Sequence, residues 1–395
     1  NPGPRMYKPA SPRAQILWLT LTHGVVDAYA LSVPFILPIL LDSVAPENYR
    51  AFFAGAFAAT GAASTSIGQV GFAWLADRGV KAPFLWLGIG TAAVGMSLLG
   101  LAPNLPVAFL LMLVGGLGVA AFHPQSAVAA ARLSQGARGL GMSVFIFGGN
   151  VGQAVGPLLL ILAYSVWSTA VFAPAMVVGL ALCVIFGRMY VSIARDSTSK
   201  GVTGPFWSRA LFVLYLIVTV RTLAVIGLLN FLSLYLDQEM ALTDTRRALV
   251  LSGFILCGSM GMLLGGPLSD RFSRLPLLLV SLILPTPIFL LALRADGLAF
   301  PLLLLAANFV LQLTTPLYIL LGQETMDRPS NLATSFVMGG AWGTAGLLQL
   351  PIGAIANSVG LAPVLSGLSL LPAAAALLLP FLPRAIVGVR PSHVT

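Results

Sequence analysis

Four ionisable side chains of this sequence stand in the middle of long apolar stretches, where a charge is costly. They are His23, Asp27, His123 and Arg221. If the stretches are membrane helices that rise about 1.5 Å per residue, all four lie near the centre of the bilayer. Charged groups at that depth are so costly that they face water, a partner charge or a ligand. Their depth therefore predicts that these side chains line a cavity or contact a partner charge.

Asp27 and His23 are the candidates for proton chemistry. They are four residues apart, which places them on one face of a helix. Burial favours the neutral acid, whereas a nearby arginine favours the carboxylate, so Asp27 could take up and release a proton as its surroundings change. We predict that Asp27 carries the proton and that His23 relays it. The alternative is that Asp27 only neutralises Arg221 in a structural ion pair.

Arg221 is the strongest candidate for substrate binding, because a guanidinium keeps its proton at working pH and so attracts anions. His123 could bind an anion or pass a proton, although a lone helical histidine is as often a packing residue. Amides inside the spans could contact the substrate or merely bridge helices. The predicted substrate-binding residues are Arg221, His123, His23, Asn150, Gln153, Asn308 and Gln312.

The elements that must position these residues are membrane helices. The chain has 395 residues, of which 58% are hydrophobic and 8% are charged, whereas soluble domains carry about 25% charged residues. Roughly 20 apolar residues suffice to span a bilayer as a helix. We predict an all-α polytopic membrane protein with twelve spans, near residues 15–41, 49–76, 83–102, 105–132, 139–163, 165–191, 208–236, 246–269, 275–294, 299–323, 331–357 and 360–383.

The 21 lysines and arginines exceed the 12 acidic residues, but their positions suit a membrane protein better than a nucleic-acid-binding one. Most fall in alternate loops and at the chain ends, which the positive-inside rule places in the cytoplasm. We therefore predict two cytoplasmic termini and no nucleic-acid partner. We expect the native chain to begin at Met6 without a cleavable signal peptide. Both cysteines lie inside predicted spans, so no structural disulfide is expected.

Short motifs recur at a nearly constant interval. Asp77-Arg78 recurs as Asp270-Arg271, Gly148-Gly149 as Gly339-Gly340 and Pro157 as Pro351, at intervals of 193, 191 and 194 residues. These intervals predict two copies of a six-helix unit; chance similarity between glycine-rich helices is the alternative. The predicted organisation is an N-terminal tail (1–14), a first bundle (15–191), a cytoplasmic linker (192–207), a second bundle (208–384) and a C-terminal tail (385–395).

Two parallel six-helix halves resemble the major facilitator superfamily, and the Asp-Arg pairs resemble its signature loop. A narrower resemblance, to the fosmidomycin-resistance family of efflux proteins, rests on motifs that cover most of the chain. These are His23 with Asp27, Phe122-His123-Pro124, the turn from Arg132 to Arg138, Gly148-Gly149-Asn150, Gly156-Pro157, the segment GGPLSDR at 265–271 and Gln323-Glu324. The family pattern has a glutamate where this chain has Gln125, so a proton step at that position is not carried over.

The resemblance implies further roles. Helices 1, 4, 7 and 10 line the cavity in this superfamily, so the resemblance places nearly all these polar residues around one space at the membrane midplane. Charged pairs are expected to latch the cytoplasmic helix ends. Gly152 and Gly156-Pro157 resemble a helix 5 motif linked to antiport, whose physical content would be close packing between the two halves. The predicted gating residues are Asp77, Arg78, Arg138, Asp270, Arg271 and Arg328.

Together these features predict a proton-coupled antiporter that exports a small anionic or amphipathic compound, such as a drug, a phosphonate or a carboxylate siderophore. An organic-anion uptake symporter, an uncoupled facilitator and a non-transporting sensor are the alternatives. The resemblance implies a multi-pass protein of the bacterial inner membrane. We expect a monomer whose partners are substrate, protons and lipid. No nucleotide-binding loop, metal-ligand spacing or nucleophile motif occurs, so no cofactor, metal ion or enzymatic activity is predicted.

Overall fold

The structure, a computed structural model, describes residues 11–77, 84–133, 138–189, 208–324 and 339–383, and these ranges contain helices and turns but no strand. The first half of the chain forms α1 (Pro12–Val44), α2 (Arg50–Ala62), α3 (Gly68–Asp77), α4 (Phe84–Leu99), α5 (Leu105–Leu133), α6 (Arg138–Trp167) and α7 (Phe172–Met189). The second half forms α8 (Arg209–Gln238), α9 (Asp244–Arg271), α10 (Arg274–Ile283), α11 (Pro285–Ala292), α12 (Ala299–Gln312), α13 (Thr315–Glu324), α15 (Ala341–Leu347), α16 (Gln349–Val359) and α17 (Leu361–Ala376). Short helical turns are η1 (Glu47–Tyr49), η2 (Ala63–Ile67), η3 (Ser168–Val171) and η6 (Leu379–Phe381).

Eight helical stretches in the described ranges are long and apolar enough to cross a membrane. The predicted all-helical class is therefore confirmed, whereas the number of twelve spans remains a prediction. Several other predicted spans coincide with short or interrupted helices. Proline accounts for two interruptions because it lacks a backbone N–H: α11 begins at Pro285, and Pro316 is the second residue of α13.

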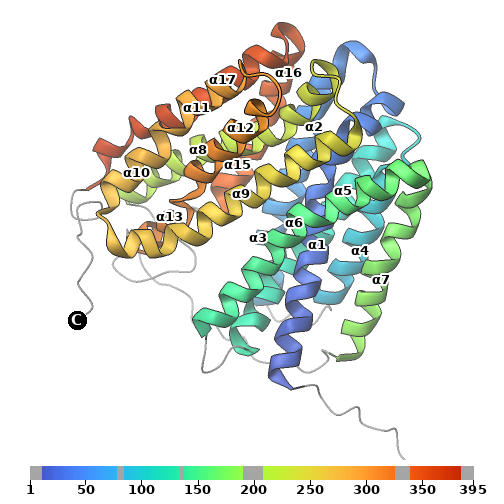
Figure 1. Cartoon of the computed structure of the whole chain (residues 1–395). Helices are drawn as coiled ribbons and strands as arrows, with labels where there is room; N and C mark the ends of the chain where they lie inside the picture. The colour runs from blue at the N-terminus through green and yellow to red at the C-terminus, as the bar shows by residue number, and fades with distance from the viewer. Residues whose placement is uncertain (1–10, 78–83, 134–137, 190–207, 325–338, 384–395) are drawn as a thin grey trace, which may run out of the picture.

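Helices of the same half of the chain pack together. α1 lies against α6, and α4 packs on α5 and α7. In the second half, α8 packs on α15 and α17, while α9 packs on α12. Figure 1 accordingly shows the blue-to-green helices gathered on one side and the yellow-to-red helices on the other.

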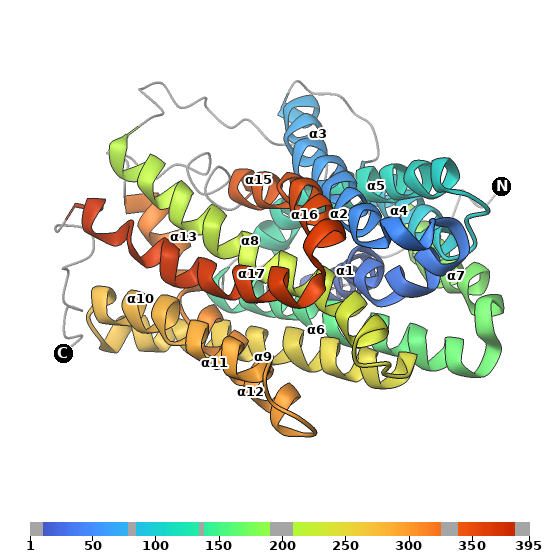
Figure 2. The ribbon, with the colours of Figure 1, turned by 90° about the horizontal axis from the view of Figure 1, so that it is seen from above.

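The two groups of helices meet along α2 with α15 and α16, and along α6 with α9 (Figure 2). Two side-chain hydrogen bonds cross this boundary. Ser233 Oγ on α8 donates to Pro34 O on α1, and Ser252 Oγ on α9 donates to Ala154 O on α6. Pro34 and Ser233 both lie in the last third of their helices, so this link holds the groups together far from the start of α1.

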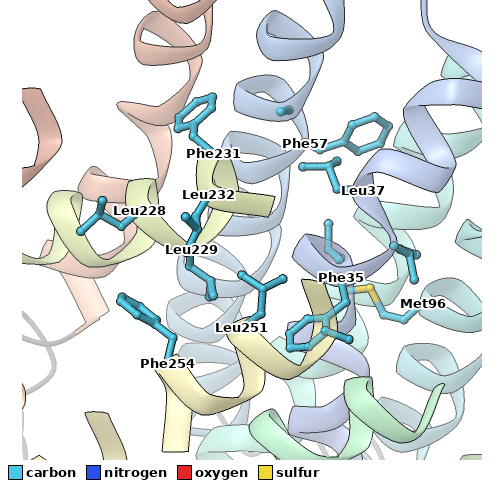
Figure 3. Close-up of a cluster of buried hydrophobic side chains, with 14 of the residues drawn as sticks. Phe35, Leu37, Phe57, Met96, Leu228, Leu229, Phe231, Leu232, Leu251 and Phe254 are labelled. Atoms are coloured by element: carbon cyan, nitrogen blue, oxygen red, sulfur yellow. The ribbon is translucent and has the colours of Figure 1, made fainter. Parts of the chain in front are cut away.

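A continuous hydrophobic core crosses the same boundary. Figure 3 shows Phe35 of α1 and Met96 of α4 close to Leu251 of α9, with Leu229 of α8 beside them. A second buried cluster, which includes Tyr318, lies within the second half of the chain. The first core buries apolar surface from both groups, and this burial stabilises their present arrangement.

Candidate functional site

Asp27 is the centre of a buried polar cluster in the first half of the chain. On α5, His123 Nε2 lies 3.0 Å from Asp27 Oδ1. On α6, Gln153 Nε2 donates to Asp27 Oδ2 at 2.9 Å. His23, one turn earlier on α1, has its Nε2 3.4 Å from the same Oδ2. The structure thus brings four of the predicted site residues together.

Backbone carbonyls fix the orientation of both imidazole rings. His23 Nδ1 lies 2.9 Å from Phe145 O, and His123 Nδ1 lies 2.9 Å from Val119 O. Since a carbonyl oxygen only accepts, each Nδ1 must carry hydrogen and donate it. The His23 ring also stacks on Phe145, with ring centroids 4.1 Å apart. In its neutral form, each ring would turn an unprotonated Nε2 toward Asp27.

Gly149 on α6 leaves the space that this cluster occupies. A Cβ at that position would lie 2.6 Å from both Asp27 Oδ2 and His23 Cε1. Real Cβ atoms do not approach other heavy atoms so closely, so any side chain there would displace the carboxylate or the ring. The glycine motif of α6 therefore contributes directly to the site.

The same three ionisable side chains also have the composition of a metal site. His23, Asp27 and His123 could each offer one ligand atom, and these atoms lie within 4.8 Å of one another. Ligands about 2.0–2.1 Å from a tetrahedral zinc ion are separated by roughly 3.3 Å. The 3.0 Å separation of His123 Nε2 and Asp27 Oδ1 is shorter and is a hydrogen-bond distance. The contact between His123 and Asp27 therefore has the geometry of a hydrogen bond, and the expectation that no metal ion binds stays a prediction.

Arg221 is the second buried charge, and it lies in the second half of the chain. Its Nε and Nη2 donate to Leu311 O, at 3.3 and 2.9 Å, and Nη2 also donates to Gln312 Oε1 and Thr315 Oγ1. Its Cζ lies 5.4 Å from the centroid of the Tyr318 ring. These partners sit at the break between α12 and α13, where the helical hydrogen-bond ladder is interrupted. Arg221 therefore caps a helix break with neutral partners.

The charge of Arg221 has no carboxylate partner among the described residues, although only 3% of the residue is exposed. Its Nη1 makes no hydrogen bond to any residue in the described ranges. A buried cation without a counter-ion is costly. The charge of Arg221 is therefore uncompensated among the described residues.

The structure corrects one sequence-based alternative about these charges. Asp27 pairs with His23 and His123 and not with Arg221, so the structural ion pair is absent. The hydrogen bonds of the charged residues form two clusters, one in each half of the chain, and the common midplane space stays a prediction. The physical reason for the two clusters is the direction of the side chains: Asp27 faces α5 and α6, whereas Arg221 faces α12 and α13.

The predicted amide residues differ in what they contact. Gln153 belongs to the Asp27 cluster and Gln312 to the Arg221 cluster. Asn308 Nδ2 donates to Phe254 O at 2.7 Å, which bridges α12 to α9, while its Oδ1 is buried without a partner. Asn150 is half-buried on α6. Asn308 therefore bridges two helices, as the alternative expects. Gln153 and Gln312 instead contact the charged residues.

The glycines of α6 do not pack the two halves together, contrary to the expectation from the antiport-like motif. A Cβ on Gly152 would collide with Gly24 O on α1, and one on Gly156 would collide with Ala28 Cβ on the same helix. These glycines therefore allow α1 and α6 to approach within the first half. The boundary between the halves uses other small residues, notably Gly55 on α2 and Gly353 on α16.

The predicted gating residues fall almost entirely outside the described parts. Arg78 and Arg328 lie outside the described ranges, and only the backbones of Asp77, Arg138 and Asp270 are described. Arg271, the last residue of α9, is exposed. The latch at the cytoplasmic helix ends therefore stays a prediction.

Sequence reasoning missed several residues that shape the two clusters. Phe145 provides both a carbonyl and a stacking ring to His23, and Val119 provides a carbonyl to His123. Thr315 and Tyr318 contact Arg221. Pro316 is the sequence signal that could have indicated the break between α12 and α13, which Arg221 contacts. No sequence signal marks Phe145, because apolar residues surround it on both sides.

The helical architecture with buried charges inside its apolar helices is that of a membrane transporter. A sequence profile described as Major Facilitator Superfamily matches residues 28–330. The chain therefore belongs to that superfamily and is a multi-pass membrane transporter. As such it binds a small-molecule substrate within a lipid bilayer.

Two relatives are similar over most of the chain. An uncharacterized MFS-type transporter of Bacillus subtilis (strain 168), YfnC, is 25% identical over 371 residues, which are 90% of each protein. The fosmidomycin resistance protein of Escherichia coli (strain K12) is 25% identical over 305 residues, which are 74% of this chain and 75% of that protein. The resemblance noted from the sequence motifs is thereby confirmed.

Solved structures of transporters share the fold. A D-xylose-proton symporter aligns with a TM-score of 0.75 at 12% identity, covering 96% of this chain and all of that one. A bacterial homolog of the human lysosomal transporter Spinster, in an inward-facing and occupied conformation, aligns with a TM-score of 0.72 at 15% identity. It covers 95% of this chain and 96% of that chain. At these identities the likeness concerns the fold alone.

Proposed function

We propose that this transporter is a proton-coupled antiporter of the bacterial inner membrane, which exports a small anionic or amphipathic compound by alternating access. The observation that carries the proposal is the contact between Asp27 and His123. Two groups that would both accept hydrogen bonds in their unprotonated forms lie 3.0 Å apart deep within apolar helices. Only a proton between them satisfies both groups. A buried site built to hold a proton is what proton coupling requires.

Arg221 supports an anionic substrate. Its guanidinium is buried, its described partners are neutral, and its Nη1 remains available. A carboxylate or phosphonate group could accept hydrogen bonds from this nitrogen and neutralise the charge. Similarity to a fosmidomycin resistance protein favours export and makes phosphonates the first compounds to test.

We further propose twelve spans in two six-helix halves, residues 15–191 and 208–384, with both chain ends in the cytoplasm. The halves would rock against each other as a monomer. Packing within each group of helices, with the groups meeting along α2 with α15 and α16 and along α6 with α9, supports this organisation. The positive-inside distribution of lysine and arginine supports the orientation.

The separation of the two charges bears on the direction of coupling. If Asp27 paired with Arg221, protonating Asp27 would free the guanidinium for an anion, and proton and substrate would bind together as in symport. Because the two residues have different partners, protonation does not release Arg221 directly. Coupling then passes through the relative motion of the halves, which is compatible with exchange.

The test is transport by the purified protein in liposomes, with an imposed pH gradient and the membrane potential held at zero. Labelled fosmidomycin is the first substrate, followed by other phosphonates and by carboxylates. An antiporter accumulates substrate in the acidic compartment, because protons leave that compartment in exchange. A symporter accumulates it in the alkaline compartment, and an uncoupled facilitator only equilibrates it. Either of those results would refute the proposal.

Two variants sharpen this experiment. Asp27→Asn keeps the size of the side chain but removes the ionisable group, so it should equilibrate substrate without accumulating it. Asp42→Asn is the matched control, because Asp42 is an exposed carboxylate at the end of α1 that pairs with Arg50 at 2.8 Å. It should accumulate substrate as the unmodified protein does. Equal losses in both variants would count against Asp27 as the proton carrier.

A further inference from the structure

The cluster around Asp27 contains more hydrogen-bond acceptors than donors when both imidazole rings are neutral. Both imidazoles use Nδ1–H to donate to a backbone carbonyl. Each neutral ring therefore has no hydrogen left on Nε2. The two Nε2 atoms converge on the Asp27 carboxylate, which is also an acceptor. Gln153 donates one hydrogen to Oδ2, and the two histidine contacts remain without one.

A first proton is required at the contact between His123 and Asp27. Two lone pairs facing each other across 3.0 Å repel, whereas one proton on either atom turns the contact into a hydrogen bond. With the proton on Nε2, this bond joins an imidazolium to a carboxylate and is charge-assisted. The proton can reside on Nε2 or on Oδ1, and the geometry is the same in both cases. His23 cannot provide it, since its Nε2 points to the other carboxylate oxygen.

A second proton position lies on His23. Its Nε2 is 3.4 Å from Asp27 Oδ2, a distance longer than an ordinary hydrogen bond but short for two facing lone pairs. Protonation of His23 would replace this repulsion by attraction to the carboxylate. The stacked Phe145 ring and the bond to Phe145 O hold the imidazole in this orientation.

We propose that the cluster binds two protons, one shared between His123 and Asp27 and a second on His23. This inference deepens the proposed proton coupling and rests on it. The formal charge of the three side chains is −1 with no proton, 0 with one and +1 with two. A transporter that empties and refills the cluster in each cycle would exchange two protons per cycle.

The cluster is electrically isolated among the described residues. Within the described ranges, the charge interactions of Asp27, His23 and His123 are with one another and with no other ionisable group. Of the helices packed against α1, α6 contributes Gln153 and apolar groups, and α8 carries Arg221, which is bound to α12 and α13. The hydroxyl of Tyr29, also on α1, is directed to Ala175 O on α7. The two proton positions are therefore governed mainly by each other.

The exposed fractions of the side chains indicate how protons enter. His123 has 26% of its side chain exposed, compared with 9% for His23 and 6% for Asp27. If protons enter at the most exposed member of the cluster, they reach His123 first and pass through Asp27 to His23.

The test is nitrogen NMR of the detergent-solubilised full chain with labelled histidine. The sequence has three histidines, and His393→Gln removes the signal that does not belong to the cluster. An imidazolium gives two similar ring-nitrogen shifts, whereas a neutral ring gives two widely separated ones. We expect both rings to change protonation in two coupled steps between about pH 5 and pH 8, the range in which histidine titrates.

Variants separate the two positions. His123→Gln keeps a side-chain donor toward Asp27 but cannot titrate, so His23 should then titrate in one step. His23→Gln should leave one step at His123. If His23 stays neutral over the whole range while His123 exchanges its proton, the cluster binds one proton: the inference fails and the proposed coupling stands. If neither ring changes protonation and the proton shared by His123 and Asp27 stays bound, both the two-proton inference and the proposed coupling fail.

Discussion

Arg221 and Asp27 occupy corresponding positions in the two halves of the chain. Arg221 follows Asp27 by 194 residues, and Thr315 follows His123 by 192 residues. These intervals match those of the repeated motifs. In each half the charged residue of one helix contacts a polar residue of the helix three predicted spans later. A duplicated fold would thus carry a proton-binding cluster in its first half and a cationic one in its second.

Substitution of Arg221 separates its structural role from its proposed binding role. Arg221→Met removes the charge and all hydrogen bonds to the α12–α13 break, and Arg221→Lys keeps the charge but loses the forked donation. Hydrogen bonds to charged groups contribute about 1.5–3 kcal/mol each at most, so both variants should unfold at lower temperature than the unmodified protein. Only Arg221→Lys should retain a measurable increase in thermal stability on addition of a transported anion. A ligand-induced increase in Arg221→Met would show that the anion binds elsewhere.

The chemistry-bearing residues were predictable from the sequence, but their grouping was not. His23, Asp27, His123 and Arg221 stand out because charge inside an apolar stretch is rare. Which charge faces which helix depends on helix rotation and tilt, and these are set by packing. In a chain of uniformly apolar helices, periodicity leaves this rotation undetermined. Asp27 contacts His123 and Gln153 rather than Arg221 because α1 approaches α5 and α6 closely.

At the scale of the elements, that close approach depends on glycine. Gly152 on α6 meets the backbone of α1 at Gly24, so a Cβ there has no room to occupy. A methyl group forced into such a contact shifts the helices and costs about 1–3 kcal/mol. Gly152→Ala should therefore lower the apparent unfolding temperature, measured by thermal unfolding in detergent. It should also weaken proton-driven transport, because α1 carries Asp27.

Gly367→Ala is the matched control for this substitution. Gly367 lies within α17, and a Cβ there would have no atom within 4 Å. Alanine in a helix interior is favoured over glycine by about 1 kcal/mol. The control should therefore unfold at the same or a slightly higher temperature. If Gly152→Ala behaves like Gly367→Ala, the α1–α6 contact does not limit stability.

The interrupted helices mark where element-level prediction stopped. The structure has breaks at Pro285 and just before Pro316, where proline lacks the N–H that a helix needs. The consequence of the second break could not be derived from spacing alone. It frees Leu311 O from the helical ladder, and Arg221 of another helix satisfies this carbonyl. That contact requires the fold, since the two residues are 90 positions apart.

At the scale of the whole molecule, the two groups of helices meet at a boundary that includes α15 and η2. Gly343 on α15 faces Ser66 of η2, and a Cβ on Gly343 would lie 3.0 Å from Ser66 Cβ. Disulfides need Cβ atoms about 3.5–4.5 Å apart, so a small adjustment would allow a cross-link between the halves. Such a disulfide would prevent the two halves from separating at this point.

We expect oxidation of Ser66→Cys/Gly343→Cys, made with Cys183→Ser and Cys257→Ser, to stop driven transport and a reductant to restore it. The control cross-links two helices within the first half. It combines Gly90→Cys on α4 with the native Cys183 on α7, and Cys257→Ser removes the other cysteine. The two Cβ atoms would lie 3.7 Å apart. Oxidation of this control should leave transport unchanged, because α4 and α7 would move together as the halves rock. Transport that continues with the halves cross-linked would contradict alternating access by rocking. Loss of transport in both variants would instead mean that motion within a half is required.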